Sequence, residues 1–301
     1  MGCMTSIILA AVTMVTWNGE WFPSGRAEHR ADPKIEAKTI QRAGQMLRGA
    51  FAAVDPSGSN DIVLCLNEMR DKETVLALAN AIGRPDLKLA IISGYRRRDR
   101  FDMQQDAILT TLPVTTASWS RWRNAKEFTP PRGYVYSEIV FPNDVTTRVY
   151  AVHLKSNYGQ TNEQIAESNR AKRANAIAQI LDQERAKRGK FAAPVAILGD
   201  MNADAWKKEF AKDTIFPLLS EAGFENILAR LDEEDRITHP GRGKWQGSVL
   251  DYIFLRELEL SAPPTVHYAN GISDHNPVLA VIDTAPKKSA TKKSTSKKKK
   301  K

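Results

Sequence analysis

The segment GISDHNPVLAVID, residues 271–283, decides how the rest of the chain is interpreted. Its second half, PVLAVID, is an apolar run typical of a buried strand. Immediately before that run, an acid and an imidazole, Asp274 and His275, stand side by side. A turn at this place needs only one short polar side chain. We therefore asked whether other strands of the chain end in residues of the same kind.

Five further predicted strands carry such side chains where their apolar runs begin or end. VTMVTWN, IVLCLNE and VAILGDMN lead to Asn18, Glu68 and Asp200. RVYAVH reaches His153, and VLDYIFL carries Asp251 near its start. Because strand ends converge at the edge of a shared sheet, we expect these side chains to form one oxygen-rich pocket. Such donors suit a hard cation, Mg²⁺ or Mn²⁺, better than zinc.

Length and composition are those of a soluble globular protein with one large domain or two ordinary ones. The chain has 301 residues, of which 42% are hydrophobic and 26% charged. Its net charge is +9, but residues 287–301 hold nine lysines and no acid, so the body is near neutral (9 − 9 = 0). We expect residues 285–301 to be a disordered tail. Either the tail attracts polyanions such as nucleic acid or anionic lipid, or it only keeps the protein soluble.

We assign residues 1–11 to no element. The largely apolar run SIILAAVTMV is ten residues long, which is too short to span a bilayer, so we expect no transmembrane segment. The run lacks a basic start and a cleavage spacer, which favours a cytoplasmic protein over one with a truncated export signal. The two cysteines, Cys3 and Cys65, exclude a disulfide framework and a cysteine-based zinc site. Nothing indicates a coiled coil or a swapped arm, so we expect a monomer.

Capping and periodicity predict four helices, over residues 33–54, 72–82, 161–187 and 206–224. The first opens with an acidic cap before a proline, and the third with the capping box TNEQ. Predicted strands outnumber helices, and hairpin-like runs mix with strand–helix–strand units. This order favours a layered α/β sandwich with sizeable sheets over a regular doubly wound sheet.

Six motifs resemble those of the endonuclease/exonuclease/phosphatase superfamily: TWNGEW, NEMRD, VHLKS, GDMNAD, LDYIF and SDHNP. They occur in the family's order and span residues 16–277. The family includes pancreatic deoxyribonuclease, abasic-site endonucleases, neutral sphingomyelinases and inositol-polyphosphate phosphatases. The resemblance implies one domain over residues 12–284, a four-layer α/β/β/α sandwich in which two mixed sheets pack face to face with helices outside. It also implies metal-dependent hydrolysis of a phosphate ester.

The resemblance gives each of these polar residues a role. Glu68 would be the main ligand of Mg²⁺ or Mn²⁺, and Asn18 and Asp274 would complete or flank the metal shell. His275 would take the proton from the attacking water, with Asp251 fixing its tautomer.

Asp200 is the alternative general base, and Asn202 would orient Asp200 and the phosphate. His153 would stabilise the phosphoryl oxygens or protonate the leaving group. In the deoxyribonuclease branch an acid supports the imidazole that matches His153. In this sequence, only Gln105 or Asp106 could take the position of that acid.

Arg70 and Arg132 resemble phosphate-contacting arginines of that branch, and Lys155 and Asn157 complete the expected substrate contacts. Together with the lysine tail, these residues favour a DNA or RNA endonuclease, so we expect nucleic acid as the substrate. The alternative is a phosphoesterase acting on phospholipid or inositol phosphate, whose tail would seek anionic membrane. A non-catalytic binding module is disfavoured because every metal and base position is filled. The pattern gives no role to His239.

Overall fold

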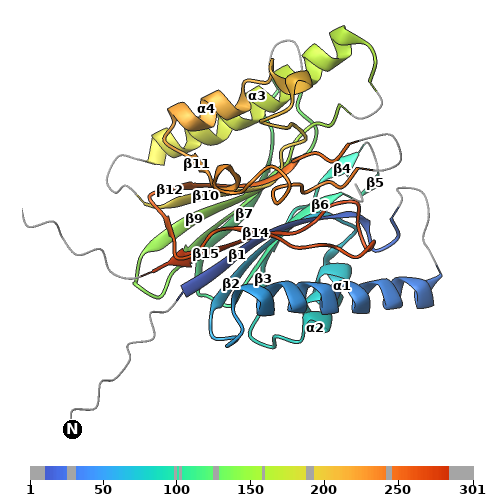
Figure 1. Cartoon of the computed structure of the whole chain (residues 1–301), viewed down its shortest axis with the longest axis vertical. Helices are drawn as coiled ribbons and strands as arrows, with labels where there is room; N and C mark the ends of the chain where they lie inside the picture. The colour runs from blue at the N-terminus through green and yellow to red at the C-terminus, as the bar shows by residue number, and fades with distance from the viewer. Residues whose placement is uncertain are drawn as a thin grey trace, which may run out of the picture.

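A computed structural model describes residues 11–25, 32–97, 100–101, 104–124, 129–157, 160–187, 193–241 and 246–284 of the chain. Two mixed β-sheets lie face to face, and helices cover their outer faces (Figure 1). This arrangement confirms the predicted four-layer sandwich. The tail at 285–301 lies outside the described residues, as does the N-terminal segment apart from Ala11.

The first sheet has seven strands, in the order β13-β15-β1-β2-β6-β3 with β14 paired to β15. β1 runs parallel to β2 and antiparallel to β15, while β2 runs antiparallel to β6. The strands are β1 (Ala11–Phe22), β2 (Asp61–Met69), β3 (Lys88–Ile92), β6 (Gln105–Thr110), β13 (Glu259–Leu260), β14 (Thr265–Val266) and β15 (Val278–Asp283).

The second sheet has six strands, in the order β11-β12-β10-β9-β8-β7. β9 and β10 are parallel, and their other neighbours in this sheet are antiparallel. The strands are β7 (Val114–Arg121), β8 (Gly133–Val140), β9 (Thr146–His153), β10 (Val195–Asp200), β11 (Glu225–Asn226) and β12 (Asp251–Arg256). A separate two-stranded ribbon is formed by β4 (Arg96–Arg97) and β5 (Arg100–Phe101).

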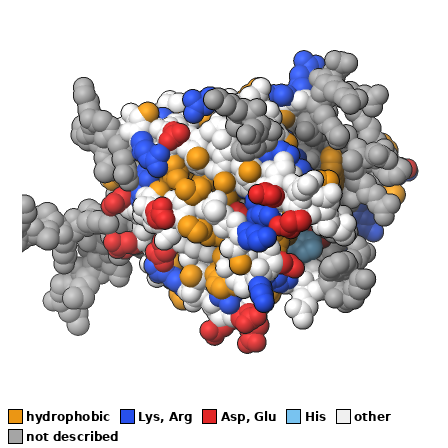
Figure 2. Space-filling view, turned by 90° about the horizontal axis from the view of Figure 1, so that it is seen from above, with side chains coloured by type: hydrophobic (Ala, Val, Ile, Leu, Met, Phe, Trp, Pro, Cys, Tyr) orange, Lys and Arg blue, Asp and Glu red, His pale blue; other side chains and the backbone are white. Residues whose placement is uncertain are grey.

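Helices α1 (Pro33–Val54) and α2 (Lys72–Ile82) cover the first sheet, and α3 (Glu163–Lys187) and α4 (Ile215–Glu221) cover the second (Figure 1). Two 3₁₀ turns, η1 (Lys208–Phe210) and η2 (Ile227–Arg230), complete the list. None of the helices in the described part is both long and apolar enough to cross a membrane. In the view from above, basic and acidic side chains are interspersed on the body (Figure 2), in keeping with its near-neutral charge.

Strand alternation explains the layers. Successive side chains of a strand point to opposite faces of its sheet. In β1, Val12 and Met14 join the core between the sheets, while Val15 and Trp17 join the core under α1 and α2. Both faces of β1 are therefore buried, which is why its sequence is almost continuously apolar.

Two helix boundaries differ from the prediction. The single helix expected over 206–224 is divided into η1 and α4, because the buried Asp213 interrupts it. One Asp213 oxygen accepts the Ile215 N–H at 3.4 Å, and the other binds the fully buried Arg173. The cap of α3 is Asn162 rather than Thr161, since the Asn162 side chain accepts from the Gln164 N–H. Exposed β7 was not predicted, because none of its residues is buried.

Candidate active site

The pairing of β9, β10 and β12 places three predicted site residues in one row. Asp200 lies opposite His153 on the parallel side and opposite Asp251 on the antiparallel side. In the other sheet, Asn18 of β1 lies opposite Asn67 of β2. The two rows meet where the Asn18 amide donates to Asp200 Oδ2 at 3.0 Å. All five side chains are buried, so the site lies at one shared edge of the two sheets.

Glu68 reaches this edge because its backbone leaves the strand geometry. Continued alternation would turn its side chain toward α1 and α2, where Leu64 and Leu66 lie. Its φ of 60° instead falls in the left-handed region, which non-glycine residues rarely adopt outside functional or strained sites. The carboxylate accepts from the Asn18 amide at 3.3 Å and from the Trp21 N–H at 3.0 Å. Glu68 therefore lies beside Asn18 and His153 in the site.

The Asp200 carboxylate is held by Asn202. The backbone N–H of Asn202 donates to Asp200 Oδ1 at 2.8 Å, and its side-chain amide donates to Oδ2 at 2.9 Å. Burial is the main cause that raises the pKa of Asp200 to about 7; the charge of His275 opposes this rise, and the charges of Asp251 and Glu68 add to it. The carboxyl group can therefore change its protonation state near neutral pH.

His275 and Asp251 form a close pair. His275 Nδ1 lies 2.7 Å from Asp251 Oδ2, while His275 Nε2 faces Asp274 Oδ1 at 3.7 Å. Burial disfavours a charged imidazole, but the charge and hydrogen bond of Asp251 outweigh it and raise the pKa of His275 to about 10. Trp17 fixes the backbone here by donating its indole N–H to the His275 carbonyl at 3.1 Å.

His153 is buried among acids. Its Nε2 lies 3.5 Å from Glu68 Oε1 and 3.6 Å from Asp200 Oδ2. Burial, with Arg132 nearby, holds the pKa of His153 well below its usual range, so the ring is neutral. Its Nδ1 has no hydrogen-bond partner among the described residues.

Among the described residues, neither candidate for an acidic partner of His153 is hydrogen-bonded to it. Gln105 is bonded to Ser93 and to the backbone of Tyr95. Asp106 accepts from the Asn67 amide through Oδ1 at 2.7 Å, while its buried Oδ2, like His153 Nδ1, has no hydrogen-bond partner there. The side chain of Asn67, which the sequence analysis passed over, thus joins Asp106 to Asp200, since its Oδ1 accepts the Asp200 backbone N–H at 3.3 Å.

Two of the four expected substrate contacts, Arg132 and Lys155, lie near His153. Arg132 donates to Gln104 and to the carbonyls of His153 and Leu154, with a bond of 2.6 Å to Gln104. Lys155 follows on the same exit segment, and burial and then the Arg132 charge lower the pKa of its ammonium. Asn157 has a buried Oδ1 without a hydrogen-bond partner in the described part of the chain.

Arg70 is engaged elsewhere. Its guanidinium pairs with Glu36 of α1 at 2.6 Å and with Asp71, the cap of α2, at 3.0 Å. The positive charge of Arg70 is thus paired with two carboxylates instead of being available to a phosphate. The structure does not bring Arg70 into the row of site residues.

Glu20 is a site residue that the sequence analysis missed. Its Oε2 accepts the backbone N–H of Asp274 at 3.0 Å. Burial raises the pKa of Glu20, and the neighbouring charges of Asp274 and Glu68 raise it further. In the described part of the chain, no lysine or arginine pairs with these three carboxylates. A mutually repelling, oxygen-only donor set fits a hard divalent cation. The signal was present in TWNGEW, two residues beyond Asn18.

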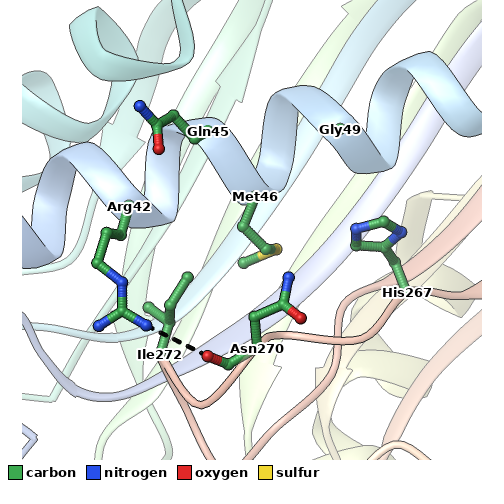
Figure 3. Close-up of a pocket in the computed structure, with 7 residues that line it drawn as sticks. All are labelled: Arg42, Gln45, Met46, Gly49, His267, Asn270 and Ile272. Carbon is green, nitrogen blue, oxygen red and sulfur yellow. Dashed lines mark hydrogen bonds between the residues drawn. The ribbon is translucent and has the colours of Figure 1, made fainter.

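His239 is the second missed residue, since its Nε2 lies 3.5 Å from Asp274 Oδ2. The surface pocket drawn in Figure 3 is a different place. It has a volume of about 290 Å³ and lies between α1 and the segment 267–272, lined by Arg42, Gln45, Met46, Gly49, His267, Asn270 and Ile272. None of the polar strand-end residues lines it.

The sequence profile of the Endonuclease/Exonuclease/phosphatase family matches residues 15–275. The chain belongs to this family. Both the predicted family and the predicted fold are thereby confirmed. Members of the endonuclease/exonuclease/phosphatase family hydrolyse phosphodiester bonds and generally use divalent metals, so membership supports a metal-dependent phosphoesterase. No curated protein matches the sequence.

Three solved structures illustrate the shared fold. A family protein from Leptotrichia buccalis is 16% identical, with a TM-score of 0.61 over 90% of this chain and 99% of that one. D. rerio TDP2, complexed with single strand DNA product, is 15% identical, with a TM-score of 0.59 over 91% and 99%. Sphingomyelinase C from Streptomyces griseocarneus is 18% identical, with a TM-score of 0.58 over 90% and 99%. At such identities the likeness concerns the fold alone.

Proposed function

We propose that this protein is a divalent-cation-dependent endonuclease that cleaves phosphodiester bonds of DNA or RNA. The observation that carries the proposal is the meeting of the Asp251–His275 pair with the carboxylates of Glu20, Glu68 and Asp274 at one edge of both sheets. A phosphodiester is an anion, so its hydrolysis needs charge neutralisation, an aimed water and a proton acceptor.

Glu68 and Asp274 would hold Mg²⁺ or Mn²⁺, with Glu20 and Asn18 beside them. The ion supplies positive charge to a phosphoryl oxygen when it is bound. Asn18 also positions the cluster, because its amide donates to both Glu68 and Asp200. Burial, together with repulsion from Asp274 and Glu68, raises the pKa of Glu20 in the metal-free protein, and a bound cation would relieve that repulsion.

Beside a bound cation, His275 would have a pKa below its metal-free value of about 10, because two positive charges would then lie close together. The neutral ring would accept the proton of the attacking water at Nε2, since Asp251 occupies Nδ1 and fixes the tautomer. Asp200 is the alternative base, since its raised pKa also suits proton transfer near neutral pH. His153 is neutral, so it donates a hydrogen bond from Nε2 to a phosphoryl oxygen rather than carrying charge.

Two observations favour a nucleic-acid substrate. The cationic side chains of Arg132 and Lys155 lie beside His153, and the chain carries a lysine tail. D. rerio TDP2, which shares the fold, was captured with single-stranded DNA. The sphingomyelinase of similar fold keeps phospholipid head groups as the second candidate.

The proposal is tested by comparing substrates under one set of conditions. Purified protein with Mg²⁺ is given DNA and RNA oligonucleotides and, separately, sphingomyelin vesicles. A Glu68→Gln variant serves as the inactive form, and Glu73→Gln on the exposed side of α2 serves as the matched control. We expect cleavage of nucleic acid by the wild type and by the Glu73 variant alone. Release of phosphocholine without nucleic-acid cleavage would overturn the nuclease proposal.

A further inference from the structure

Two imidazoles and one carboxylate face each other at the rim of the site. His239 Nε2 lies 3.5 Å from Asp274 Oδ2, and His275 Nε2 lies 3.7 Å from Asp274 Oδ1. The two rings meet edge to face, with their centroids 5.0 Å apart. One nitrogen or oxygen of each residue lies within 4.8 Å of the others. This is a nitrogen-rich donor set, unlike the oxygen-only set around Glu68.

The backbone that carries His239 is fixed on both sides. His239 exchanges two backbone hydrogen bonds of 2.8 Å with Ser248. The carbonyl of Thr238 accepts the N–H of Asn276 at 2.6 Å, which ties this segment to the residue after His275. The Thr238 hydroxyl also accepts from the Asp251 N–H at 3.0 Å. The closeness of the two histidines is therefore built into the main chain.

His275 is oriented as a metal-binding histidine would be. Its Nδ1 faces the Asp251 carboxylate at 2.7 Å, which leaves Nε2 as the outward nitrogen. Metal-ligating histidines commonly bond such a carboxylate through their second ring nitrogen. The side chain of His239 is 29% exposed and that of Asp274 is 43% exposed, so an ion has access from solvent. The separations of 3.5 and 3.7 Å between these donor atoms are close to those between ligands that lie about 2.0–2.2 Å from one tetrahedral ion.

We propose that His239, Asp274 and His275 form a site for a borderline transition-metal ion such as Zn²⁺. Imidazole nitrogen selects Zn²⁺ over Mg²⁺, which prefers oxygen donors. A Zn²⁺ ion bound at these three residues would occupy His275 Nε2, the proposed proton acceptor, and the Asp274 carboxylate, a proposed Mg²⁺ ligand. Its binding would therefore inhibit hydrolysis. The binding half of the proposal stands alone, whereas the inhibition half rests on the proposed function.

Direct binding tests the first half without any activity measurement. Tag-free protein is titrated with Zn²⁺ in a calorimeter, and Co²⁺ is added separately to record its visible absorption. We expect one Zn²⁺ site whose affinity falls at least tenfold in His239→Asn. The asparagine can still donate to Asp274, so the variant should fold, which its thermal denaturation in EDTA verifies. His267→Asn, which alters a histidine of the pocket in Figure 3, is the matched control and should bind as the wild type does.

Equal Zn²⁺ affinity in the wild type and His239→Asn would overturn the site, as would an absence of Zn²⁺ binding. Loss of Zn²⁺ binding in Glu68→Gln but not in His239→Asn would also overturn it, by moving the ion to the carboxylate cluster.

Inhibition of nucleic-acid cleavage by Zn²⁺ is measured at saturating Mg²⁺. The rate of each variant is compared with the rate of the same variant without Zn²⁺. We expect His239→Asn to need at least tenfold more Zn²⁺ for half inhibition than His267→Asn. Zn²⁺ binding without inhibition would reject the second half alone. Absence of any nuclease activity would instead count against the proposed function and leave the binding result standing.

Discussion

Asp251 is the neighbour that raises the pKa of His275 most, ahead of Asp200 and Asp274. In metal-free protein, we expect Asp251→Asn to lower the pKa of His275 from about 10, because both the charge and the charge-assisted hydrogen bond are lost. NMR titration of the histidine rings measures this directly, with the exposed Asp235→Asn as control. An unchanged His275 titration in Asp251→Asn would contradict the assigned pair.

The same pair has a consequence for stability. A pKa raised in the folded state contributes stability that is complete below the unfolded value of about 6.5 and is lost as pH rises toward about 10. In metal-free protein the stability difference between wild type and Asp251→Asn should therefore shrink from pH 6 to pH 10. Denaturant unfolding at several pH values checks it, and a constant difference would speak against the charged pair.

At the scale of single residues, the sequence was informative where a polar side chain ended an apolar run. Asp200, Asp251 and His275 stand out in that way, and strand pairing then brings them together. Glu20 and His239 lie in loops or irregular strand ends, so no periodicity marked them. The ion pair of Arg70 with Glu36 was not predictable, because Glu36 comes from a helix distant in sequence and only the packed structure shows the contact.

Among the elements, β9 and β10 approach each other closely at Gly199. This residue has φ 138°, and a Cβ there would lie 1.9 Å from the Val152 carbonyl oxygen. We expect Gly199→Ala to destabilise the fold by about 1–3 kcal/mol or more, since the two strands would have to separate beside Asp200. Urea denaturation measures the change in free energy of unfolding.

Gly49 provides the opposite control for the same substitution. It lies exposed in α1, and a Cβ there would meet only the His267 ring at 4.0 Å. Gly49→Ala should therefore stabilise the protein by about 0.5–1 kcal/mol. If both variants had the same effect, the crowding at Gly199 would be disproved.

Helix α2 depends on its cap, Asp71, whose side chain accepts from the backbone N–H and the hydroxyl of Thr74. Burial alone would raise the pKa of Asp71, but these bonds and Arg70 lower it. The stability it contributes is therefore present above the unfolded pKa of about 3.9 and lost as pH falls further. At neutral pH, we expect Asp71→Ala to cost about 1 kcal/mol and Asp71→Asn clearly less, measured by denaturant unfolding. Equal losses would show that the cap bonds contribute little.

Element boundaries were predictable where local signals decide them. The cap Asp32 with Pro33 starts α1, and Gly83 at φ 77° ends α2, as expected. The break at Asp213 was not predictable, because it depends on an ion pair with Arg173 across forty residues of sequence. The layered architecture followed from the order of elements, whereas strand order within each sheet required the structure.

At the scale of the whole molecule, the positive charge is concentrated in the lysine tail, and the body is near neutral. Removing residues 285–301 should weaken binding to nucleic acid and flatten its dependence on salt, by about 0.9 in log–log slope for each lost phosphate contact on duplex DNA. Filter binding across a series of salt concentrations measures the slope. An unchanged slope would show that the tail only aids solubility.

The central claim is that a divalent cation and the Asp251–His275 pair act together at the shared edge of the two sheets. The most direct test incubates supercoiled plasmid with the wild type and with His275→Ala, each in Mg²⁺ and in EDTA. We expect nicking by the wild type in Mg²⁺, its loss in EDTA, and a fall of roughly 10²–10⁴-fold in the variant. Nicking that persists in EDTA or is undiminished in His275→Ala would contradict the account.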